Sequence, residues 1–449
     1  MSHQQEAIAS IRWFGEVPTG WRVQRLKQVT VSVTSGVSVN ASDISAEEGQ
    51  FGVLKTSAVS GGKFFHQENK TVWESEIDRL ACPVTRDSVI VSRMNTPSLV
   101  GECGYVPHDF PNLFLPDRLW KLMFDQERVF TPYLSTVLSS AGARQALSCM
   151  ATGTSPSMKN LSIEELGNLP IPLPSLKEQK IISAYIQRET AHIDSLLTEK
   201  ECMLTLLEEK LAALISYVVT CGLNPEFLSK SSGREWFGDI PAHWGVSKLK
   251  YVVTKIGSGI TPRGGAESYK PEGIPMFRSQ NIHFDGLHID DIVFIDADMH
   301  AIMANSKVNN GDVLLNITGA SIGRCFYVEE MQGEANVNQH VCIIRPSNQI
   351  LTKYLYFVMR SCIGQAQIEL SQSGSGREGL NFEALGNFSV PLPPLDEQLT
   401  ITEYLEAVNK KSHLLLSAIK SSVEQLKERR VALITAAVTG LLPLEDMTR

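Results

Sequence analysis

The 449-residue sequence lacks long apolar runs and paired cysteines. No apolar stretch approaches the roughly 20 residues that span a bilayer, so no membrane-spanning helix is predicted. The opening stretch MSHQQEAIAS has neither the basic nor the apolar region of a secretory signal. The eight cysteines are scattered without a C-x-x-C pair, which argues against a zinc site or a disulfide framework. These absences favour a reducing cytoplasmic location.

An excess of basic residues is also missing. The net charge is −8 at pH 7, and nucleic-acid-binding chains are often basic, so the balance is a mild argument against a nucleic-acid partner. It does not exclude one, because phosphates respond to the local surface that they meet and partner subunits supply further charge. With 43% hydrophobic residues the chain can bury large cores, and its length predicts about two to four domains.

The motifs of common enzyme classes are absent as well. A phosphate-binding G-x-x-x-x-G-K-[ST] loop is not present, because Phe64 follows Gly61-Gly62-Lys63. The segment Asn224-Pro225-Glu226-Phe227 lacks the second proline that adenine methyltransferases usually carry. A nuclease pattern is obtained only by forcing together Pro116-Asp117 and Glu178-Gln179-Lys180. These absences argue against an enzyme, although an enzyme with an unrecognised site stays an alternative.

A metal site is not expected either. The ten histidines include no H-E-x-x-H pattern. His283 and His288 lie five residues apart in a segment rich in glycine and aspartate, which is more typical of a loop.

What the chain does have is a tandem repeat. Three blocks occur twice in the same order, and eight of fifteen positions in the first block are identical, so chance is a poor explanation. The paired blocks are Trp13–Lys27 with Trp236–Lys250, Leu166–Gln179 with Leu385–Gln398, and Ala213–Leu223 with Ala432–Leu442. The halves diverge strongly between the first two blocks. We infer that the two halves share one fold and carry different surfaces.

The sequence between the blocks predicts an α+β fold with two mixed α/β domains. Short runs such as Ser88–Arg93 and Val341–Pro346 have strand composition, while Thr131–Leu147 and Leu351–Leu370 have helical spacing. We predict an N-terminal variable domain over 1–174, a helix over 175–222, a linker over 223–235, a second variable domain over 236–393 and a second helix over 394–449.

Each second block opens a long helix. The proline phrases PIPLPSLKEQ and VPLPPLDEQ form a stiff, extended lead-in, and their acidic residues suit the positive end of a helix dipole. From Leu176 to Val219 there is no proline or glycine, so one helix of about 65 Å is predicted. Heptad spacing predicts that the two helices bury their apolar seams on each other as a coiled coil, and the alternative is that each helix packs on its own domain. If the two helices lie antiparallel, the halves are related by pseudo-two-fold symmetry. The seam of the coiled coil would hold Ile186, Ile193, Leu196, Met203, Leu207, Leu214 and Tyr217 from the first helix, and Leu405, Val408, Leu415, Ile419, Leu426 and Leu433 from the second.

These features together resemble the specificity subunit of type I restriction-modification systems. The resemblance rests on WFGEVPTGW and WFGDIPAHW, on the two proline phrases, and on the helix ends ALISYVVTCGL and ALITAAVTGLL. It implies that each variable domain is a target recognition domain that reads one half of a bipartite double-stranded DNA sequence. It also implies that the helices set the spacer and dock two methyltransferase subunits, which bind S-adenosylmethionine, with restriction subunits as further partners. The chain itself would hold no cofactor.

Base reading needs side chains with fixed donors and acceptors, such as arginine or lysine to guanine and asparagine or glutamine to adenine. Polar and glycine-rich segments of both variable domains offer them. The candidate DNA-binding residues are Lys55, Thr56, Lys63, Arg93, Asn95, Arg263, Arg278, Gln280, Asn281, His283 and Arg377. The alternative is that each is an ordinary solvated side chain. For the whole chain, the alternative is an adaptor of the same shape that holds two protein partners apart.

Overall fold

The computed structural model describes residues 13–155, 157–234, 237–261, 265–372 and 379–448. Contacts divide the chain into two compact units. Unit 1 comprises Met1–Glu199 with Ser422–Arg449, and unit 2 comprises Lys200–Ser421. Two long helices, α5 (Leu176–Cys221) and α11 (Leu395–Thr439), each contribute one half to either unit. In the described parts of the chain, no helix is apolar enough over a sufficient length to cross a membrane.

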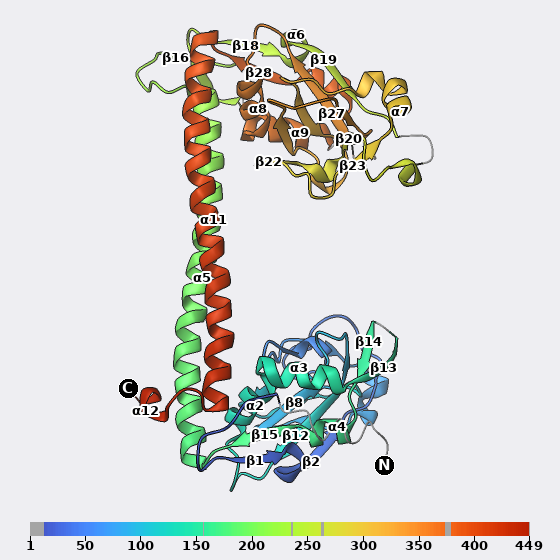
Figure 1. The fold of residues 1–449 in the computed structure, drawn as a ribbon, viewed down its shortest axis with the longest axis vertical. Helices are drawn as coiled ribbons and strands as arrows, with labels where there is room; N and C mark the ends of the chain where they lie inside the picture. The colour runs from blue at the N-terminus through green and yellow to red at the C-terminus, as the bar shows by residue number, and fades with distance from the viewer. Residues whose placement is uncertain (1–12, 156, 235–236, 262–264, 373–378, 449) are drawn as a thin grey trace. The chain divides into compact units, whose positions relative to one another are not determined.

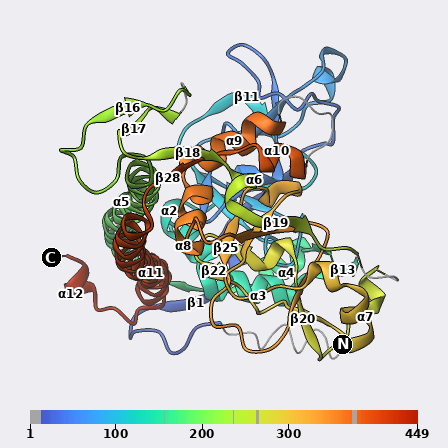
Figure 2. The same ribbon diagram turned by 90° about the horizontal axis from the view of Figure 1, so that it is seen from above.

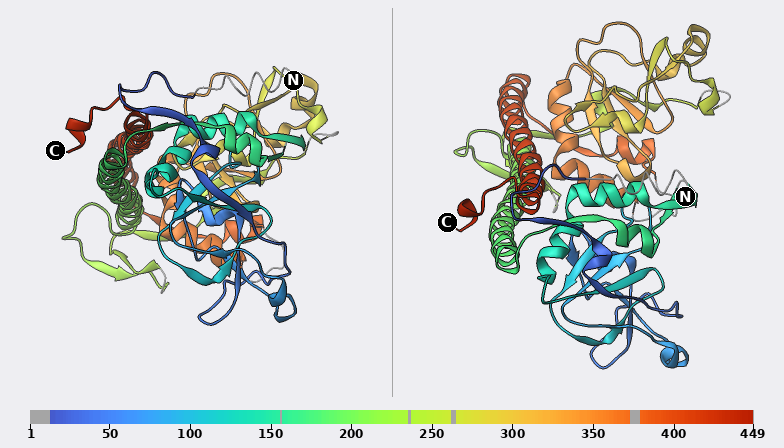
Figure 3. Two further views of the ribbon diagram at one scale, coloured as in Figure 1. Left: turned by 90° about the horizontal axis from the view of Figure 1, so that it is seen from below. Right: turned by 60° about the horizontal axis from the view of Figure 1, so that its bottom comes forward.

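An antiparallel sheet lies at the centre of unit 1. Its strand order is β10, β8, β12, β2, with bounds Cys103–Val106, Ser88–Ser92, Leu119–Phe124 and Thr30–Ser35. Every residue of β8 is buried, because side chains alternate between the two faces of a strand and both faces are covered here. Val89 and Val91 enter one hydrophobic core, and Ile90 enters another. Helices α2 (Thr131–Ser139) and α3 (Ala141–Met150), teal in Figure 3, belong to the first core.

A second sheet adjoins the other core. Its order is β6, β3, β11, β7, with bounds Asn69–Thr71, Gly52–Leu54, Phe110–Phe114 and Pro83–Val84. Strands β3 and β11 run parallel, with Gly52 opposite Leu113 and Val53 opposite Phe114. The chain segments that leave β3 and β11 therefore emerge at the same edge of this sheet.

Unit 2 repeats the strand order of the central sheet and the parallel pair, although its second sheet has three strands rather than four among the described residues. Its central sheet has the order β19, β27, β24, β25, with bounds Val253–Ser258, Val341–Pro346, Val313–Asn316 and Cys325–Tyr327. The parallel pair is β20 (Ile274–Phe277) with β26 (Asn336–Val337). Helices α8 (Thr352–Arg360) and α9 (Cys362–Gln372) take the places of α2 and α3. The predicted α+β fold with an internal duplication is confirmed.

The repeated blocks meet each other at the boundary of each variable region. In unit 1, β1 (Arg22–Arg25) pairs antiparallel with β15 (Pro170–Leu173). In unit 2, β18 (Gly245–Lys248) pairs antiparallel with β28 (Ser389–Leu392). The proline phrase is thus an extended strand, as its restricted φ values predict. It leads directly into α5 or α11.

Within each unit, α5 and α11 lie side by side (Figures 1 and 2). In unit 1, Nε of Arg430 lies 2.9 Å from Oδ1 of Asp194, while Ile186 shares a core with Val438, so the segments run antiparallel. In unit 2, Val218 of α5 shares a core with Leu405 of α11. The long helices predicted from the sequence are confirmed.

The seam between the helices differs from the predicted one by one position. Its first line is as expected: Ile186, Ile193, Leu207 and Leu214 on α5, with Leu405, Ile419, Leu426 and Leu433 on α11, are all buried or half-buried. The second line is wrong in part, because Met203, Tyr217 and Leu415 are exposed, whereas Leu196 and Val408 are half-buried.

The buried second line lies one residue further along each helix. It holds Leu204, Leu211 and Val218 on α5 and Leu416 on α11. Leu196 is half-buried beside it. A coiled-coil seam uses two positions of each heptad, separated by three and then by four residues. The second row of apolar residues can therefore lie on either side of the first row. The structure uses the side on which apolar residues recur without a lysine.

Candidate nucleic-acid interface

In unit 1, loops from several strands gather at one end of the central sheet. The backbone N–H of Arg93, which follows β8, donates to the carbonyl of Arg118 at 3.0 Å, and the N–H of Leu161 donates to the carbonyl of Arg93 at 2.8 Å. Strand β14 (Met158–Asn160) pairs with β9 (Met94–Asn95), so Lys159 lies opposite Asn95. The sheet thus brings Arg93 and Asn95 to one place, as expected of reading residues, together with Arg118 and Lys159.

A polar pocket of about 440 Å³ opens among these loops. It is lined in part by Lys55, Thr56, Lys70, Asp117 and Arg118. The ammonium of Lys70 pairs with Asp43, and this hydrogen bond and charge lower the pKa of the Asp43 carboxyl. Three cationic side chains around one polar hollow are suited to an anionic ligand such as a phosphate backbone. Lys55 and Thr56 were predicted from the sequence, whereas Arg118 and Lys70 were missed.

Unit 2 gathers the same loops with the same backbone bonds. The N–H of Ile317 donates to the carbonyl of His340 at 3.0 Å, and the N–H of Leu380 donates to Ile317 at 2.8 Å. Ile317 therefore corresponds to Arg93, and His340 to Arg118. Thr318 also forms a β-bridge with Gly379. The two units share one loop framework on which different side chains stand.

Buried asparagines hold the loops of unit 2. The carboxamide of Asn316 donates to the carbonyl of Ser279 at 2.8 Å, and that of Asn281 donates to the carbonyl of His288 at 2.8 Å. The side-chain oxygen of Asn338 accepts from the N–H of His340 at 3.1 Å. Because buried amides that bond to backbone groups fix those groups in place, these loops are ordered before any ligand arrives.

The predicted segment Phe277–Gly286 divides into supporting and exposed residues. Asn281 is 1% exposed, so its predicted role as a DNA-contacting residue is replaced by that of a loop support. The guanidinium of Arg278 donates to the carbonyl of Asp291 at 2.7 Å and lies over the ring of Tyr269. Of the candidate DNA-binding residues in this segment, only Gln280 is exposed. It remains a predicted base-contacting residue.

His283 lies beside His288 and Asp285 on the hairpin of β21 (Ile282–His283) and β22 (Gly286–Leu287). The two rings are stacked, with centroids 4.0 Å apart and an interplanar angle of 16°. Stacked rings direct their nitrogen lone pairs side by side rather than toward one point. Nε2 of His283 faces the carbonyl of Gln280 at 2.9 Å, and Nε2 of His288 faces Asp285 at 3.2 Å. One ligand atom from each of the three side chains lies within 4.8 Å of the others, and we assign no metal role to them.

Two of the predicted cations of unit 1, Lys63 and Arg93, have partners within the protein. Lys63, on the hairpin strand β5 (Lys63–Phe64), forms an ion pair with Asp194 of α5 at 2.9 Å. Asp194 also binds Arg430. Although partial burial opposes ionisation, the hydrogen bond from Lys63 and the charge of Arg430 leave the pKa of Asp194 below its usual value. The guanidinium of Arg93 lies over the ring of Trp120.

The remaining candidate DNA-binding residues are Asn95, Arg263 and Arg377. Asn95 bonds locally, accepting from the N–H of Thr96 at 2.9 Å. Arg263 and Arg377 lie outside the described residues. Their role stays a prediction.

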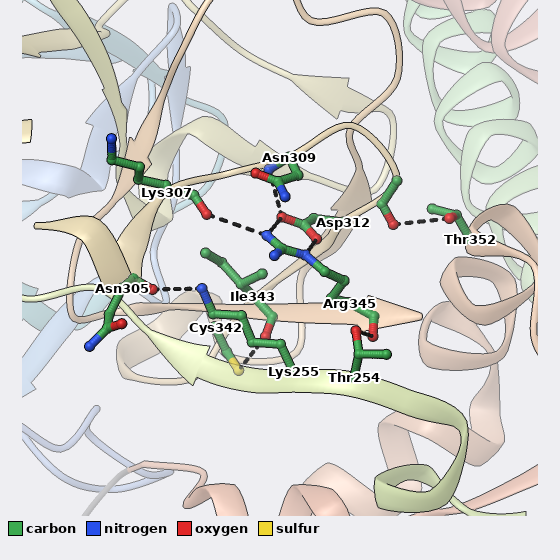
Figure 4. A network of polar contacts seen from close by, with 11 residues as sticks. Thr254, Lys255, Asn305, Lys307, Asn309, Asp312, Cys342, Ile343, Arg345 and Thr352 are labelled. Atoms are coloured by element: carbon green, nitrogen blue, oxygen red, sulfur yellow. Dashed lines mark hydrogen bonds and ion pairs between the residues drawn. The ribbon is translucent and has the colours of Figure 1, made fainter. Parts of the chain in front are cut away.

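The opposite end of the unit 2 sheet carries a different polar network (Figure 4). Arg345 of β27 binds Asp312 through two bonds, Nε to Oδ1 at 2.6 Å and the terminal nitrogen to Oδ2 at 2.9 Å. Hydrogen bonding to Asp312 raises the pKa of Arg345. Burial and the charge of Arg345 lower the pKa of Lys255, whose ammonium donates to the carbonyl of Asn305 at 2.7 Å. Strand pairing places Val313 opposite Ile344 and Asn316 opposite Val341, so this network supports the sheet away from the reading loops.

Replacing Arg345 with methionine is expected to destabilise unit 2 more than Asp312→Asn does. Asp312 is 0% exposed, and without Arg345 it keeps the N–H of Asn309 as a partner but loses the cation that is bonded to it, with only the charge of Lys255 nearby. Removing one partner of a buried ion pair costs about 3–5 kcal/mol. Asp312→Asn leaves a guanidinium that is 29% exposed to water, so a loss of about 1–3 kcal/mol is expected.

Hydrogen exchange of β24 and β27 across a denaturant series measures both losses, with the strands of unit 1 as the internal control. Equal losses, or the reverse order, would contradict the structural role assigned to Arg345.

Comparison with known proteins supports this architecture. The profile of the type I restriction modification DNA specificity domain matches residues 241–425. The type I restriction enzyme EcoBI specificity subunit of Escherichia coli is 26% identical over 300 residues, covering 65% of this chain and 62% of that protein. The MjaX specificity subunit of Methanocaldococcus jannaschii is 20% identical over 431 residues, covering 95% of this chain and 94% of that one.

Solved structures share the fold. A chain from a structure of a type I R-M system superposes with a TM-score of 0.70 at 18% identity, covering 95% of this chain and 100% of that one. The HsdS subunit from Thermoanaerobacter tengcongensis gives a TM-score of 0.51 at 19% identity, covering 95% and 99%. The class is thus a duplicated, two-unit protein with long connecting helices. The chain is similar in sequence and in fold to type I restriction-modification specificity subunits.

Proposed function

We propose that this chain is the DNA sequence-specificity subunit of a type I restriction-modification complex, in which each unit reads one half of a bipartite double-stranded target. The observation that carries the proposal is that both units gather the same loops by the same backbone bonds, yet present different side chains on them. One framework with two different sets of hydrogen-bonding groups is suited to two different base sequences.

The long helices serve as the spacer and as docking surfaces in this proposal. Apart from the seam, α5 exposes Met203, Leu206 and Tyr217, and α11 exposes Leu399 and Leu414. Apolar side chains exposed on a long helix favour contact with a partner protein. We propose two methyltransferase subunits as these partners, with S-adenosylmethionine bound by them, and restriction subunits as further members.

The chain itself acts without catalysis in this proposal. It supplies sequence reading and assembly, and the chemistry belongs to its partners. A prokaryotic cytoplasm, where the host DNA lies, is the location that fits this role.

Mapping of methylated adenines by single-molecule sequencing, in the host with and without the gene, tests the proposal. We expect a two-part motif with a fixed gap that disappears on deletion and returns on complementation. A methylation pattern that does not depend on the gene would contradict the proposal.

The alternative is a two-headed adaptor that binds proteins only. Binding of the chain with its modification subunit to duplex DNA separates the two functions. A DNA-binding subunit loses affinity steeply as salt rises, because bound phosphates release counterions. Absence of DNA binding at low salt would favour the adaptor.

A further inference from the structure

Gln339 lies at the reading end of unit 2, in the loop between β26 and β27, where it is half-buried. No motif or composition singles it out in the sequence. By the shared backbone bonds, its counterpart in unit 1 is Asp117, which lines the polar pocket there. The two units thus place a carboxamide and a carboxylate at the same point of one framework.

A hydrogen-bonded relay orients this carboxamide. Nε2 of Gln339 lies 2.8 Å from Nε2 of His340, and Nδ1 of His340 lies 2.6 Å from Oγ1 of Thr318. An amide nitrogen can only donate, so Nε2 of His340 accepts and its ring proton is on Nδ1. Nδ1 then donates to Thr318, which closes the relay.

The backbone beneath the relay is equally fixed. The N–H of Asn338 donates to the carbonyl of Phe277 at 3.1 Å, and the carbonyl of His340 accepts from Ile317 at 3.0 Å. The loop therefore holds Gln339 in one direction at little further entropic cost on binding.

One N–H and the carbonyl of Gln339 remain available. Among the described residues, no further side-chain bond of Gln339 is found. A paired donor and acceptor on one planar amide is the group that matches N7 and the N6 amino group of adenine in the major groove. A carboxylate such as Asp117 carries acceptors only and would be repelled by N7, so it suits cytosine instead.

Resting on the proposed function, we infer that Gln339 reads an adenine in the half-site of unit 2, and that His340 and Thr318 position its carboxamide. The ligand is one A·T base pair contacted through the major groove. The unit 1 half-site is not read in this way.

The test uses the full complex in the host, with the chromosomal gene replaced and methylated adenines mapped. Gln339→Glu removes the donor, so we expect methylation to lose its preference for A·T by roughly ten-fold or more at one position of one half-site. Thr318→Val breaks the relay but keeps the carboxamide, and a smaller loss at the same base pair is expected. Gln332→Glu, an exposed residue of the same unit, is the matched charge control and should leave the motif unchanged.

The outcomes separate this inference from the proposed function. A wild-type chain that directs no two-part methylation overturns both. A wild-type motif that Gln339→Glu leaves no different from Gln332→Glu overturns the inference alone. If Gln339→Glu abolishes methylation at every site, Thr318→Val decides: a shifted preference at one base pair supports the inference, and an unshifted motif overturns it.

Discussion

A chain that lacks one heptad in both long helices should methylate a target with a shorter gap and unchanged half-sites. The matched deletions are Leu204–Lys210 in α5 and Leu414–Lys420 in α11. Each removes whole seam positions, so the residues on either side keep their phase. One heptad is about 10 Å of helix, and about three base pairs of duplex DNA have the same length. We therefore expect a gap shorter by about two to three base pairs in the methylation map.

The control is the α5 deletion alone. It shifts one side of the seam against the other, so the helices can no longer bury their apolar positions together, and we expect loss of the assembled complex. A double deletion that keeps the original gap, or that alters a half-site, would contradict the role of the helices as a spacer.

The second large effect is expected from Gln398→Leu and Gln179→Leu. Both side chains are fully buried. Oε1 of Gln179 accepts from the N–H of Phe130 at 2.8 Å, and its Nε2 donates to Arg128 and Pro174, both at 2.9 Å. Leucine fills the space but removes the partner of three backbone groups, one buried and two part-buried, which costs about 2–4 kcal/mol.

Gln398 makes the equivalent bonds in unit 2, accepting from Leu351 at 2.8 Å and donating to Gln349 and Pro393 at 3.1 and 3.0 Å. Each glutamine thus joins the start of a long helix to the segment that precedes α2 or α8. Denaturant unfolding followed by hydrogen exchange measures the loss unit by unit. Gln187→Leu, an exposed glutamine of α5, is the matched control and should cost little. Equal effects of Gln187→Leu and Gln179→Leu would refute this role of Gln179.

Much of this architecture could be predicted from the sequence, because the repeated blocks fall on elements with strong local signals. The proline phrases dictate extended strands, and the proline-free stretches dictate long helices. The role of Gln179 could not be predicted, since it depends on the carbonyl of Arg128, which is distant in sequence. One signal was present: Glu-Gln recurs in both phrases, although the residue before it changes from Lys177 to Asp396.

The reading residues were harder to predict for a similar reason. The polar segments selected from the sequence form short strands and turns, and composition does not distinguish Asn281, which is buried, from Gln280, which is exposed. Arg118 and Gln339 lie in short connections without a distinctive composition. They reach the reading end only because parallel pairing of β11 with β3 and of β26 with β20 brings those connections there.

The pairing of β1 with β15, and of β18 with β28, has a consequence for how such a protein changes. In each unit the chain enters and leaves the variable region on adjacent antiparallel strands built from the repeated blocks. The variable region between these strands is therefore an insert whose two ends are neighbours, held together by the paired strands of the repeated blocks. A recombination event between two genes that share these blocks would exchange a whole variable region without disturbing the helices or the other unit. New specificities can then arise in a single genetic step, rather than by gradual mutation of individual contacts.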